Sequence, residues 1–451
     1  MFHHKSLLLM PAVLAVALCG LAAWAEPPAE FLNKQVTMVA DPPVKLVDQE
    51  GAGRLYEVGP LTVLVMEGTP REMGFQHGRL LAKKIHHIIK EGYMVKALWG
   101  RGYTPEYVNA QSERMQKHFP PSIIEELNGM VEGLKAAGVD DITYEDVRLG
   151  ITQAEILHFP PNAPPACSNF AVWGRWTTDG RLLHARNLDW SIEGDAQDDA
   201  AVLIWRPKGE HPFMMLGWAG GVGSVSGMNA KGITLGEMTL PSGDATFDGL
   251  PLFLQMRMML ETCSTLDEAV KFFETSPRTT GWNFIIGDAK IPDGRALETD
   301  GKYCTVFGPN DPKENEATGH WGMPDCVRRT NHPIGMEQLL RLAKKYGKEE
   351  LGLEITEPDQ ITLLVPVLQQ QNTWQRYEWL SRRIEDLPGK IDVEQAIRIL
   401  ATGPVHADNT LHSFVFDPKN HDAWVAIAGN NPPVTATDTP FTRVHLEEWF
   451  K

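Results

Sequence analysis

Cysteine is scarce in this sequence, which has 5 among its 451 residues. No CxxC pair and no HExxH stretch occurs, and the 15 histidines are scattered along the chain. Structural zinc sites, thioredoxin-like sites and helix-borne catalytic zinc sites use such spacings, so the sequence supports none of them. We therefore expect the protein to use no metal and no organic cofactor.

Basic residues are outnumbered, with 42 Lys and Arg against 58 Asp and Glu and a formal net charge of −16. No basic run interrupts this balance. A surface so acidic repels phosphate backbones and anionic lipid. We therefore expect no nucleic-acid partner. The hydrophobic share of 43% and the charged share of 22% are those of an ordinary globular protein.

Long apolar runs are absent except near the start. Lys5 precedes an apolar stretch from Leu7 to Leu21, and Ala23-Trp24-Ala25 supplies small residues after it. This order is typical of a secretory signal peptide over residues 1–25. A membrane anchor is the alternative, but the stretch is shorter than the ~20 residues that a spanning helix needs. We expect an exported protein, periplasmic or secreted, without a membrane span.

The segment from residue 26 to 152 has a mostly helical pattern. One helix is expected over residues 71–93, where Gly74-Phe-Gln-His-Gly78 places two helix-weakening glycines on one turn. We expect these glycines to let the helix backbone pack closely against another element. A capping box at Ser122-Ile-Ile-Glu125 predicts the start of a second helix, which ends before Gly138.

The pattern changes to β-structure after a proline-rich segment at residues 160–166. Asp179-Gly180 predicts a hairpin that begins at Cys167 and returns through Arg181 to Ala185. Further strands and helices alternate along the rest of the chain. The strands are expected at 201–205, 213–217, 232–239, 283–288, 296–299, 413–416 and 423–427, and the helices after a capping box at 265–268, at 372–384 and at 392–400. Short strands with grouped helices favour sheet layers covered by helices.

Cys167 is a small nucleophile at the start of this hairpin. If the chain were cut between Ala166 and Cys167, the new α-amino group would have a pKa near 7.7–8.0. One residue would then supply both a nucleophile and a general base. On the returning strand, Asp189 could hold the amine and Arg186 could stabilise a thiolate. A buried thiol without a catalytic role, and a surface ion pair of Arg186 with Asp189, are the simpler alternatives.

These residues form a pattern that resembles a known family. Cys167-Ser-Asn-Phe-Ala-Val-Trp-Gly and Arg186-Asn-Leu-Asp-Trp190 look like the start of the mature chain in N-terminal-nucleophile (Ntn) cysteine hydrolases of the penicillin acyltransferase-like family (peptidase family C45), which are related to choloylglycine hydrolases. The other matching segments follow in the family's order: Gly227-Met-Asn-Ala-Lys-Gly232, Trp282-Asn-Phe-Ile-Ile-Gly-Asp288, Thr330-Asn-His-Pro333, Asn372-Thr-Trp-Gln-Arg-Tyr377 and Thr410-Leu-His-Ser-Phe-Val-Phe-Asp417. Gly74 to Gly78 also matches, so the resemblance covers most of the chain after residue 25.

The resemblance implies an α+β fold, the four-layer αββα sandwich of Ntn hydrolases, with a helical N-terminal segment. It also implies a nucleophile at Cys167 that self-cleavage of the bond from Ala166 exposes. The other implied roles are contact with the amine for Asp189, contact with the nucleophile for Arg186, oxyanion donation for Asn331 and completion of the polar cluster for Arg376. Thr239 occupies the position of a second oxyanion donor, where choloylglycine hydrolases have asparagine.

The implied organisation has three parts: a signal peptide (1–25), an N-terminal segment that becomes a small subunit (26–166) and a catalytic region that becomes a large subunit (167–451). The two cleaved chains are expected to stay associated. The implied activity is cleavage of a linear, non-peptide amide in a small N-acyl substrate through an acyl-enzyme. Acyl transfer to an amine, such as a penicillin nucleus, is one alternative, and a catalytically silent binding protein on the same fold is another.

Some of these residues also have structural interpretations. Asn331 could serve as a turn-former, and Arg376 could lie on a solvated helix face. A structural role is favoured for His77. Five tryptophans are candidates for an acyl pocket, with core packing as the alternative: Trp173, Trp176, Trp190, Trp218 and Trp282. Cys304 and Cys326 are the closest pair of cysteines for a disulfide.

Overall fold

The structure is a computed structural model that describes residues 26–158, 166–190, 195–316, 319–352, 354–361 and 368–451. The predicted signal peptide and residues 160–165 of the proline-rich segment lie outside the described residues. Within the described ranges, no helix combines the length and the apolar character needed to cross a bilayer.

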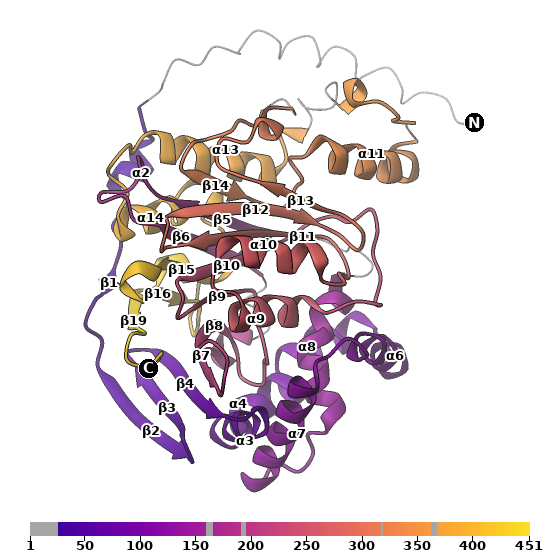
Figure 1. Cartoon of the computed structure of the whole chain (residues 1–451), viewed down its shortest axis with the longest axis vertical. Coiled ribbons are helices and arrows are strands. Elements are labelled where there is room, and N and C mark those ends of the chain that lie inside the picture. The colour runs from indigo at the N-terminus through magenta and orange to yellow at the C-terminus, as the bar shows by residue number, and fades with distance from the viewer. Residues whose placement is uncertain (1–25, 159–165, 191–194, 317–318, 353, 362–367) are drawn as a thin grey trace.

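Two large β-sheets form the centre of the described molecule (Figure 1). The seven-stranded sheet has the order β1-β19-β16-β15-β6-β5-β14, and the ten-stranded sheet has the order β13-β12-β11-β10-β9-β8-β7-β4-β3-β2. The strands of the first sheet are β1 (Met38–Val39), β5 (Ala166–Val172), β6 (Leu183–Asp189), β14 (Cys326–Arg329), β15 (Thr410–Asp417), β16 (Asp422–Ile427) and β19 (Phe441–His445). Those of the second are β2 (Val44–Glu50), β3 (Gly53–Val58), β4 (Leu61–Gly68), β7 (Ala200–Pro207), β8 (Phe213–Trp218), β9 (Ser226–Asn229), β10 (Ile233–Thr239), β11 (Trp282–Asp288), β12 (Asp293–Thr299) and β13 (Cys304–Phe307). A small hairpin pairs β17 (Gly429–Asn430) with β18 (Pro433–Val434).

The two sheets pack face to face. On β7, Val202 and Ile204 belong to the same buried cluster as Phe414 and Phe416 of β15, so side chains from both sheets fill the space between them. The alternate residues of β7 point the other way, toward helices, as the two-residue period of a strand requires; Leu203 is one of them.

Helices cover both outer faces. Over the seven-stranded sheet lie α2 (Ala29–Asn33), α13 (Asn372–Glu385) and α14 (Val393–Leu400). Against the other sheet lie α9 (Leu252–Thr262) and α10 (Leu266–Thr275), together with the N-terminal helices α3 (Pro70–Leu80), α4 (Ala82–His86), α5 (Tyr93–Ala97), α6 (Pro105–Gln116), α7 (Pro121–Ala136) and α8 (Tyr144–His158). A π-helical turn (His87–Glu91) joins α4 to α5, and α11 (Met336–Leu351) lies at the opposite end of the molecule (Figure 1). The predicted four-layer αββα sandwich is thus confirmed.

The glycines of Gly74-Phe-Gln-His-Gly78 explain how α3 and α7 pack. A Cβ atom on Gly74 would overlap the carbonyl oxygen of Glu126, and one on Gly78 would overlap that of Met130. The prediction of close backbone packing is confirmed, and the partner is α7, which contributes its own glycines to the same contact.

The N-terminal segment also contains strands that the sequence analysis did not predict. Strand β4 pairs in parallel with β7, and β3 and β2 extend the ten-stranded sheet from it. The segment is therefore part of the central sheet as well as helical cover.

Two local predictions are wrong. Helix α7 begins directly after Pro120, and no side chain caps it, so Ser122 is not the cap of this helix. Cys304 and Cys326 do not form a disulfide, because the four cysteines of the described chain are free thiols. The two residues lie on strands of different sheets.

Candidate active site

The predicted hairpin that starts at Cys167 is confirmed as strands β5 and β6. Their antiparallel register pairs Cys167 with Leu188 and Ala166 with Asp189. The turn between the strands includes Gly180, whose φ of +77° favours glycine. The hairpin therefore places Asp189 opposite the bond between Ala166 and Cys167.

Two side chains from distant parts of the chain hold the backbone of Cys167. Its N–H donates to Oδ1 of Asn331 at 2.6 Å, and its carbonyl oxygen accepts a hydrogen bond from Nη1 of Arg376. Nη2 of Arg376 also donates to the same Asn331 oxygen at 3.0 Å. Arg376 is buried, so it does not lie on a solvated helix face.

Asn331 is itself held in a fixed orientation. Its backbone N–H donates to Oγ1 of Thr373 at 2.9 Å, and its side-chain Nδ2 donates to the carbonyl oxygen of Thr239 at 2.8 Å. A side-chain amide carries two N–H donors, so one donor of Nδ2 is left over for another acceptor. Thr239 thus supports Asn331 through its backbone, while its hydroxyl lies 3.5 Å from Glu237.

Arg186 connects the thiol to an acid that the sequence analysis missed. Its Nη2 lies 3.5 Å from Sγ of Cys167 and 3.2 Å from Oε2 of Glu237, and its Nε donates to the Glu237 carbonyl oxygen at 2.6 Å. Arg186 and Glu237 are both buried. Burial raises the pKa of Glu237 to about 7, while the Arg186 charge opposes that rise. A single acid inside the apolar strand β10 was the signal that could have identified it.

Asp189 is buried, and only one of its carboxyl oxygens is satisfied. Oδ1 accepts a hydrogen bond from Oγ1 of Thr410 at 2.6 Å, whereas Oδ2 has no partner among the described residues. Burial raises the pKa of this carboxyl to about 6, although the charges of Arg376 and Arg186 lower it. The simple surface ion pair of Arg186 with Asp189 is therefore excluded, because both side chains are inaccessible to solvent.

In the continuous chain the thiol of Cys167 is inaccessible and protonated. Its residue has 0% exposure. The pKa of the thiol is raised to about 12, mainly by burial; the Arg186 charge opposes this rise, and the charges of Glu237 and Asp189 add to it. A thiol with such a pKa is a weak nucleophile near neutral pH.

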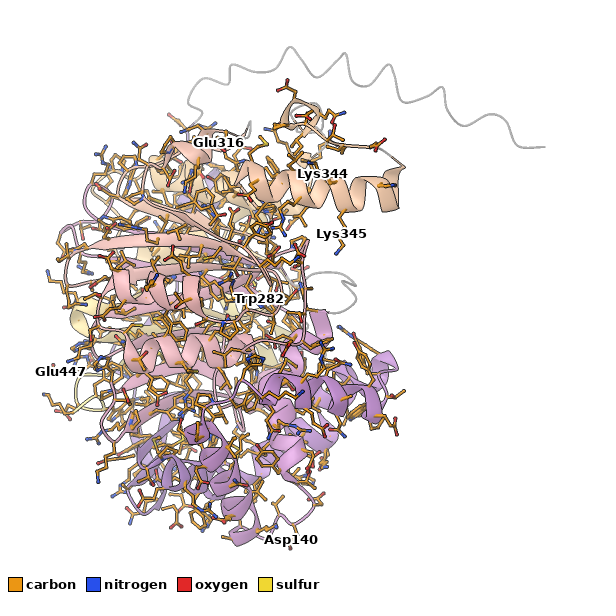
Figure 2. The ribbon with its side chains drawn as sticks, turned by 45° about the vertical axis from the view of Figure 1, so that its right-hand side comes forward. Asp140, Trp282, Glu316, Lys344, Lys345 and Glu447 are labelled. Atoms are coloured by element: carbon orange, nitrogen blue, oxygen red, sulfur yellow. The ribbon has the colours of Figure 1, made fainter. Side chains whose placement is uncertain are left out.

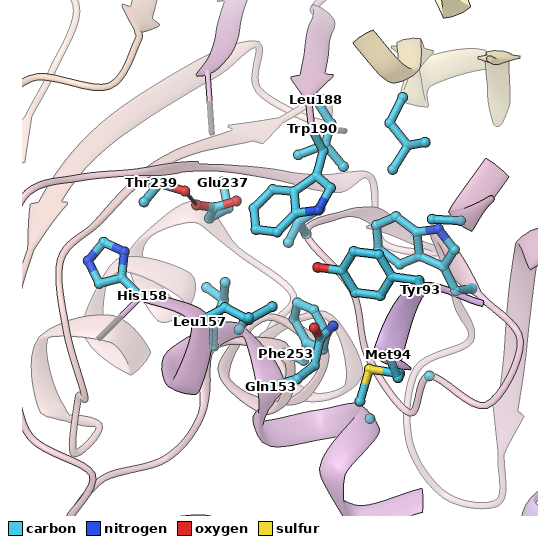
Figure 3. Close-up of a pocket in the computed structure, with 18 of the residues that line it drawn as sticks. Tyr93, Met94, Gln153, Leu157, His158, Leu188, Trp190, Glu237, Thr239 and Phe253 are labelled. Carbon is cyan, nitrogen blue, oxygen red and sulfur yellow. Dashed lines mark hydrogen bonds between the residues drawn. The ribbon is translucent and has the colours of Figure 1, made fainter. Parts of the chain in front are cut away.

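A cavity of about 490 Å³ lies beside this cluster. Leu188, Glu237 and Thr239 line it on the side of the sheets (Figure 3). Asp189 is also a lining residue. The N-terminal segment supplies the other side, where the lining residues include Ile88, Ile89, Tyr93, Met94, Gln153, Leu157 and His158. The wall is mostly apolar, and its volume suits a small organic ligand.

Three of the five candidate tryptophans line this cavity, namely Trp190, Trp218 and Trp282. Trp173 and Trp176 instead pack in the hydrophobic core. His77 accepts a hydrogen bond from the Gly220 N–H at 3.0 Å and so holds a glycine-rich part of the cavity wall, in line with the structural role expected for it.

Comparison with known proteins bears on this region. Residues 176–332 match the family described as acyl-coenzyme A:6-aminopenicillanic acid acyl-transferase. This part of the chain is therefore similar to a penicillin acyltransferase-like domain. The matched residues include Arg186, Asp189, Thr239 and Asn331, and they begin after Cys167. The resemblance predicted from the sequence is thereby confirmed.

Curated relatives extend the similarity along the chain. A protein of Archaeoglobus fulgidus, named only as uncharacterized, is 26% identical over 90% of this chain, and protein dcd1A of Dictyostelium discoideum is 25% identical over 59% of it. The chain spans 66% of the length of each relative, just under two thirds.

Solved structures are also similar to parts of the chain. A Caenorhabditis elegans N-acylethanolamine-hydrolyzing acid amidase ortholog shares 16% identity at a TM-score of 0.39, covering 56% of this chain and 93% of its own. A conjugated bile acid hydrolase variant from Clostridium perfringens shares 13% at 0.39, covering 62% and 93%. Penicillin V acylase from Agrobacterium tumefaciens shares 15% at 0.35, covering 58% and 83%.

Proposed function

We propose that the protein is an Ntn cysteine hydrolase that cuts itself before Cys167 and then cleaves linear amides of small N-acyl substrates. The observation that carries this proposal is the set of contacts around one peptide bond. Asn331 and Arg376 hold the backbone of Cys167, Arg186 approaches its sulfur, and the unpartnered Oδ2 of Asp189 lies on the strand opposite. The family match supports the same broad class of amide hydrolases and acyltransferases.

Self-cleavage starts from the sulfur of Cys167. The thiol attacks the carbonyl carbon of Ala166, its proton passes to the departing backbone nitrogen, and the acyl group moves from nitrogen to sulfur. Water then hydrolyses this thioester, which leaves a carboxylate on Ala166 and an amine on Cys167. Glu237 and Asp189, whose pKa values burial raises to about 7 and about 6, are the acids next to the thiol that can relay its proton.

The liberated amine would give Oδ2 of Asp189 a partner, which this oxygen lacks among the described residues. An ammonium group can donate to Oδ2 and neutralise the buried carboxylate. In its neutral form the amine accepts the thiol proton, and Arg186 stabilises the thiolate. We infer that the second N–H of Asn331 donates to the oxyanion of the substrate, a contribution typically worth on the order of 10²–10³ in rate.

The mature enzyme is proposed to consist of chains 26–166 and 167–451, held together after export of the protein. Strand pairing of β4 with β7 and the cavity wall from α8 support this association, because removal of the first chain would open both the sheet and the cavity. The proposed acceptor of the acyl group is water.

Processing is tested by intact mass and N-terminal sequencing of the purified protein. Wild-type chains should begin at Cys167 in the larger fragment, whereas Cys167→Ala should remain uncut and fail to hydrolyse N-acyl amides. Cys167→Ser should be processed slowly and hydrolyse poorly. Cleavage before residue 167 in the alanine variant would show that this thiol does not carry out the cut.

Acyl transfer is the second candidate, because the matching family is described as an acyltransferase. Product analysis with an added amine acceptor, including 6-aminopenicillanic acid, separates transfer from hydrolysis. A single uncut wild-type chain without thiol reactivity would instead support a binding protein on this fold.

A further inference from the structure

Helix α8 presents two polar side chains, Gln153 and His158, on an otherwise small or apolar cavity face. Gly150, Gln153, Ala154 and Leu157 line the cavity and follow the spacing that puts residues on one side of a helix. Packing alone would be served by another aliphatic residue at position 153. A buried amide at this position is favourable only if it forms a hydrogen bond.

The side-chain oxygen of Gln153 has no hydrogen-bonding partner among the described residues. Its side chain is more than nine-tenths buried, and its Oε1 makes no hydrogen bond with the described residues. Figure 3 shows Gln153 beside Phe253, across the cavity from Glu237 and Thr239. Its amide therefore belongs to the wall opposite strand β10.

A second buried group in the same cavity is also unsatisfied. Trp282 is 3% exposed, and its indole Nε1–H has no hydrogen-bond acceptor among the described residues. This residue pairs in register with Thr239, whose carbonyl oxygen holds Asn331, and its ring lies 5.1 Å from that of His158. Figure 2 places Trp282 where the strands meet the N-terminal helices.

We propose that Gln153 and Trp282 recognise hydrogen-bonding groups on the acyl moiety of the substrate, which is therefore a hydroxylated or amide-bearing acyl chain and not a plain hydrocarbon. This inference rests on the proposed function for the identity of the ligand as an acyl group. A plain alkyl chain would displace water and leave both groups buried and unpaired, which is unfavourable. A hydroxyl both donates and accepts, so it can satisfy either residue.

The test compares octanoyl p-nitroanilide with a series of monohydroxylated octanoyl p-nitroanilides in which the hydroxyl moves along the chain. At least one hydroxylated substrate should have a kcat/KM about tenfold above that of the plain one, mainly through KM. In Gln153→Leu this preference should fall to within about twofold. Trp282→Phe should remove the preference at a different hydroxyl position.

Leu157→Val is the matched control, because it changes the same wall without changing its polarity; it should alter both substrate classes to the same extent. The inference is overturned if wild type prefers no hydroxylated substrate, or if Gln153→Leu keeps the wild-type preference. If wild type hydrolyses the plain and the hydroxylated substrates equally well, this inference is refuted while the proposed function stands.

A binding measurement separates this inference from the proposed function. Cys167→Ala is titrated with octanoic acid and the hydroxyoctanoic acids, and binding is followed by the fluorescence of the cavity tryptophans. Tighter binding of a hydroxylated acid that is lost on adding Gln153→Leu supports the inference even if wild type hydrolyses no amide. Equal binding of all the acids contradicts it.

Discussion

Glu237 offers a direct test of how the site controls its thiol. Nη2 of Arg186 lies 3.2 Å from Oε2 of Glu237 and 3.5 Å from Sγ of Cys167, so the carboxylate and the sulfur are at most about 6.7 Å apart. Two unit negative charges at that distance repel by about 2.5 kcal/mol at an effective dielectric constant near 20. This energy corresponds to nearly two units of thiol pKa.

Substituting Glu237→Gln removes this charge and keeps an oxygen that can accept from Arg186. We therefore expect the pKa of Cys167 to fall by about one to two units, because Arg186 then acts on the thiolate without an opposing acid. The substitution should lower the thiol pKa because a thiol titrates at alkaline pH, where Glu237 of the wild type, with a pKa of about 7, is ionised.

The assay is a pH titration of thiolate absorbance in the ultraviolet, taken as the difference between each protein and its Cys167→Ala counterpart. This readout needs no reagent to reach the sulfur, so it applies to cut and uncut chains alike. Glu155→Gln is the matched control, because Glu155 is also buried with a pKa raised to about 7, yet it binds Leu252 and Thr279 and not Arg186. An unchanged or higher Cys167 pKa in Glu237→Gln would refute the reasoning.

Two further predictions concern stability. Gly78→Ala should lower the free energy of unfolding, measured in urea, by about 1–3 kcal/mol, because its Cβ would overlap the Met130 carbonyl oxygen. Gly100→Ala is the control and should have little effect, since its Cβ would lie 3.6 Å from the nearest atom. Equal losses of stability in the two variants would contradict the packing argument. In uncut Cys167→Ala, the folded-state pKa of Asp189 is raised by burial to about 6, so stability should fall as pH rises from about 4 toward 6. Adding Asp189→Asn to that variant should then stabilise it by up to about 3 kcal/mol near pH 8 and by little near pH 4. If the double variant is instead less stable near pH 8, the buried charge of Asp189 is already compensated and the prediction is wrong.

The sequence predicted the elements whose patterns are local. The hairpin after Cys167, the capping box at Thr265 and Glu268 and the late helices and strands have periodicities or turn residues that specify them. Strand β4 was missed because Leu61–Gly68 is a short apolar run, and such a run does not distinguish a buried strand from a buried helix. Ser122 was assigned as a cap because its spacing fits, but the helix begins at Pro121, directly after Pro120 and two residues earlier than that cap would place it.

The residues of the candidate site were likewise only partly predictable from the sequence. Resemblance selected Asn331 and Arg376, but only the fold shows that they meet at the backbone of Cys167 from 164 and 209 residues away. Glu237 stands out in the sequence only as a single acid in strand β10, and its role became clear only from the contact that Arg186 makes with it from the other sheet. Gln153 likewise acquires significance only once α8 is known to face the cavity.

The architecture argues that the N-terminal segment is a working part of the proposed enzyme and not a disposable propeptide. It supplies strand β4 to the central sheet, the wall of α8 to the cavity and the His77 contact that holds Gly220. Each of these contacts crosses the proposed cut, so cleavage would free the Cys167 amine without separating the surfaces that bind substrate. Substrate choice would then depend on residues from both sides of the cut, such as Gln153 and Trp282, while the chemistry would be carried out by residues after it.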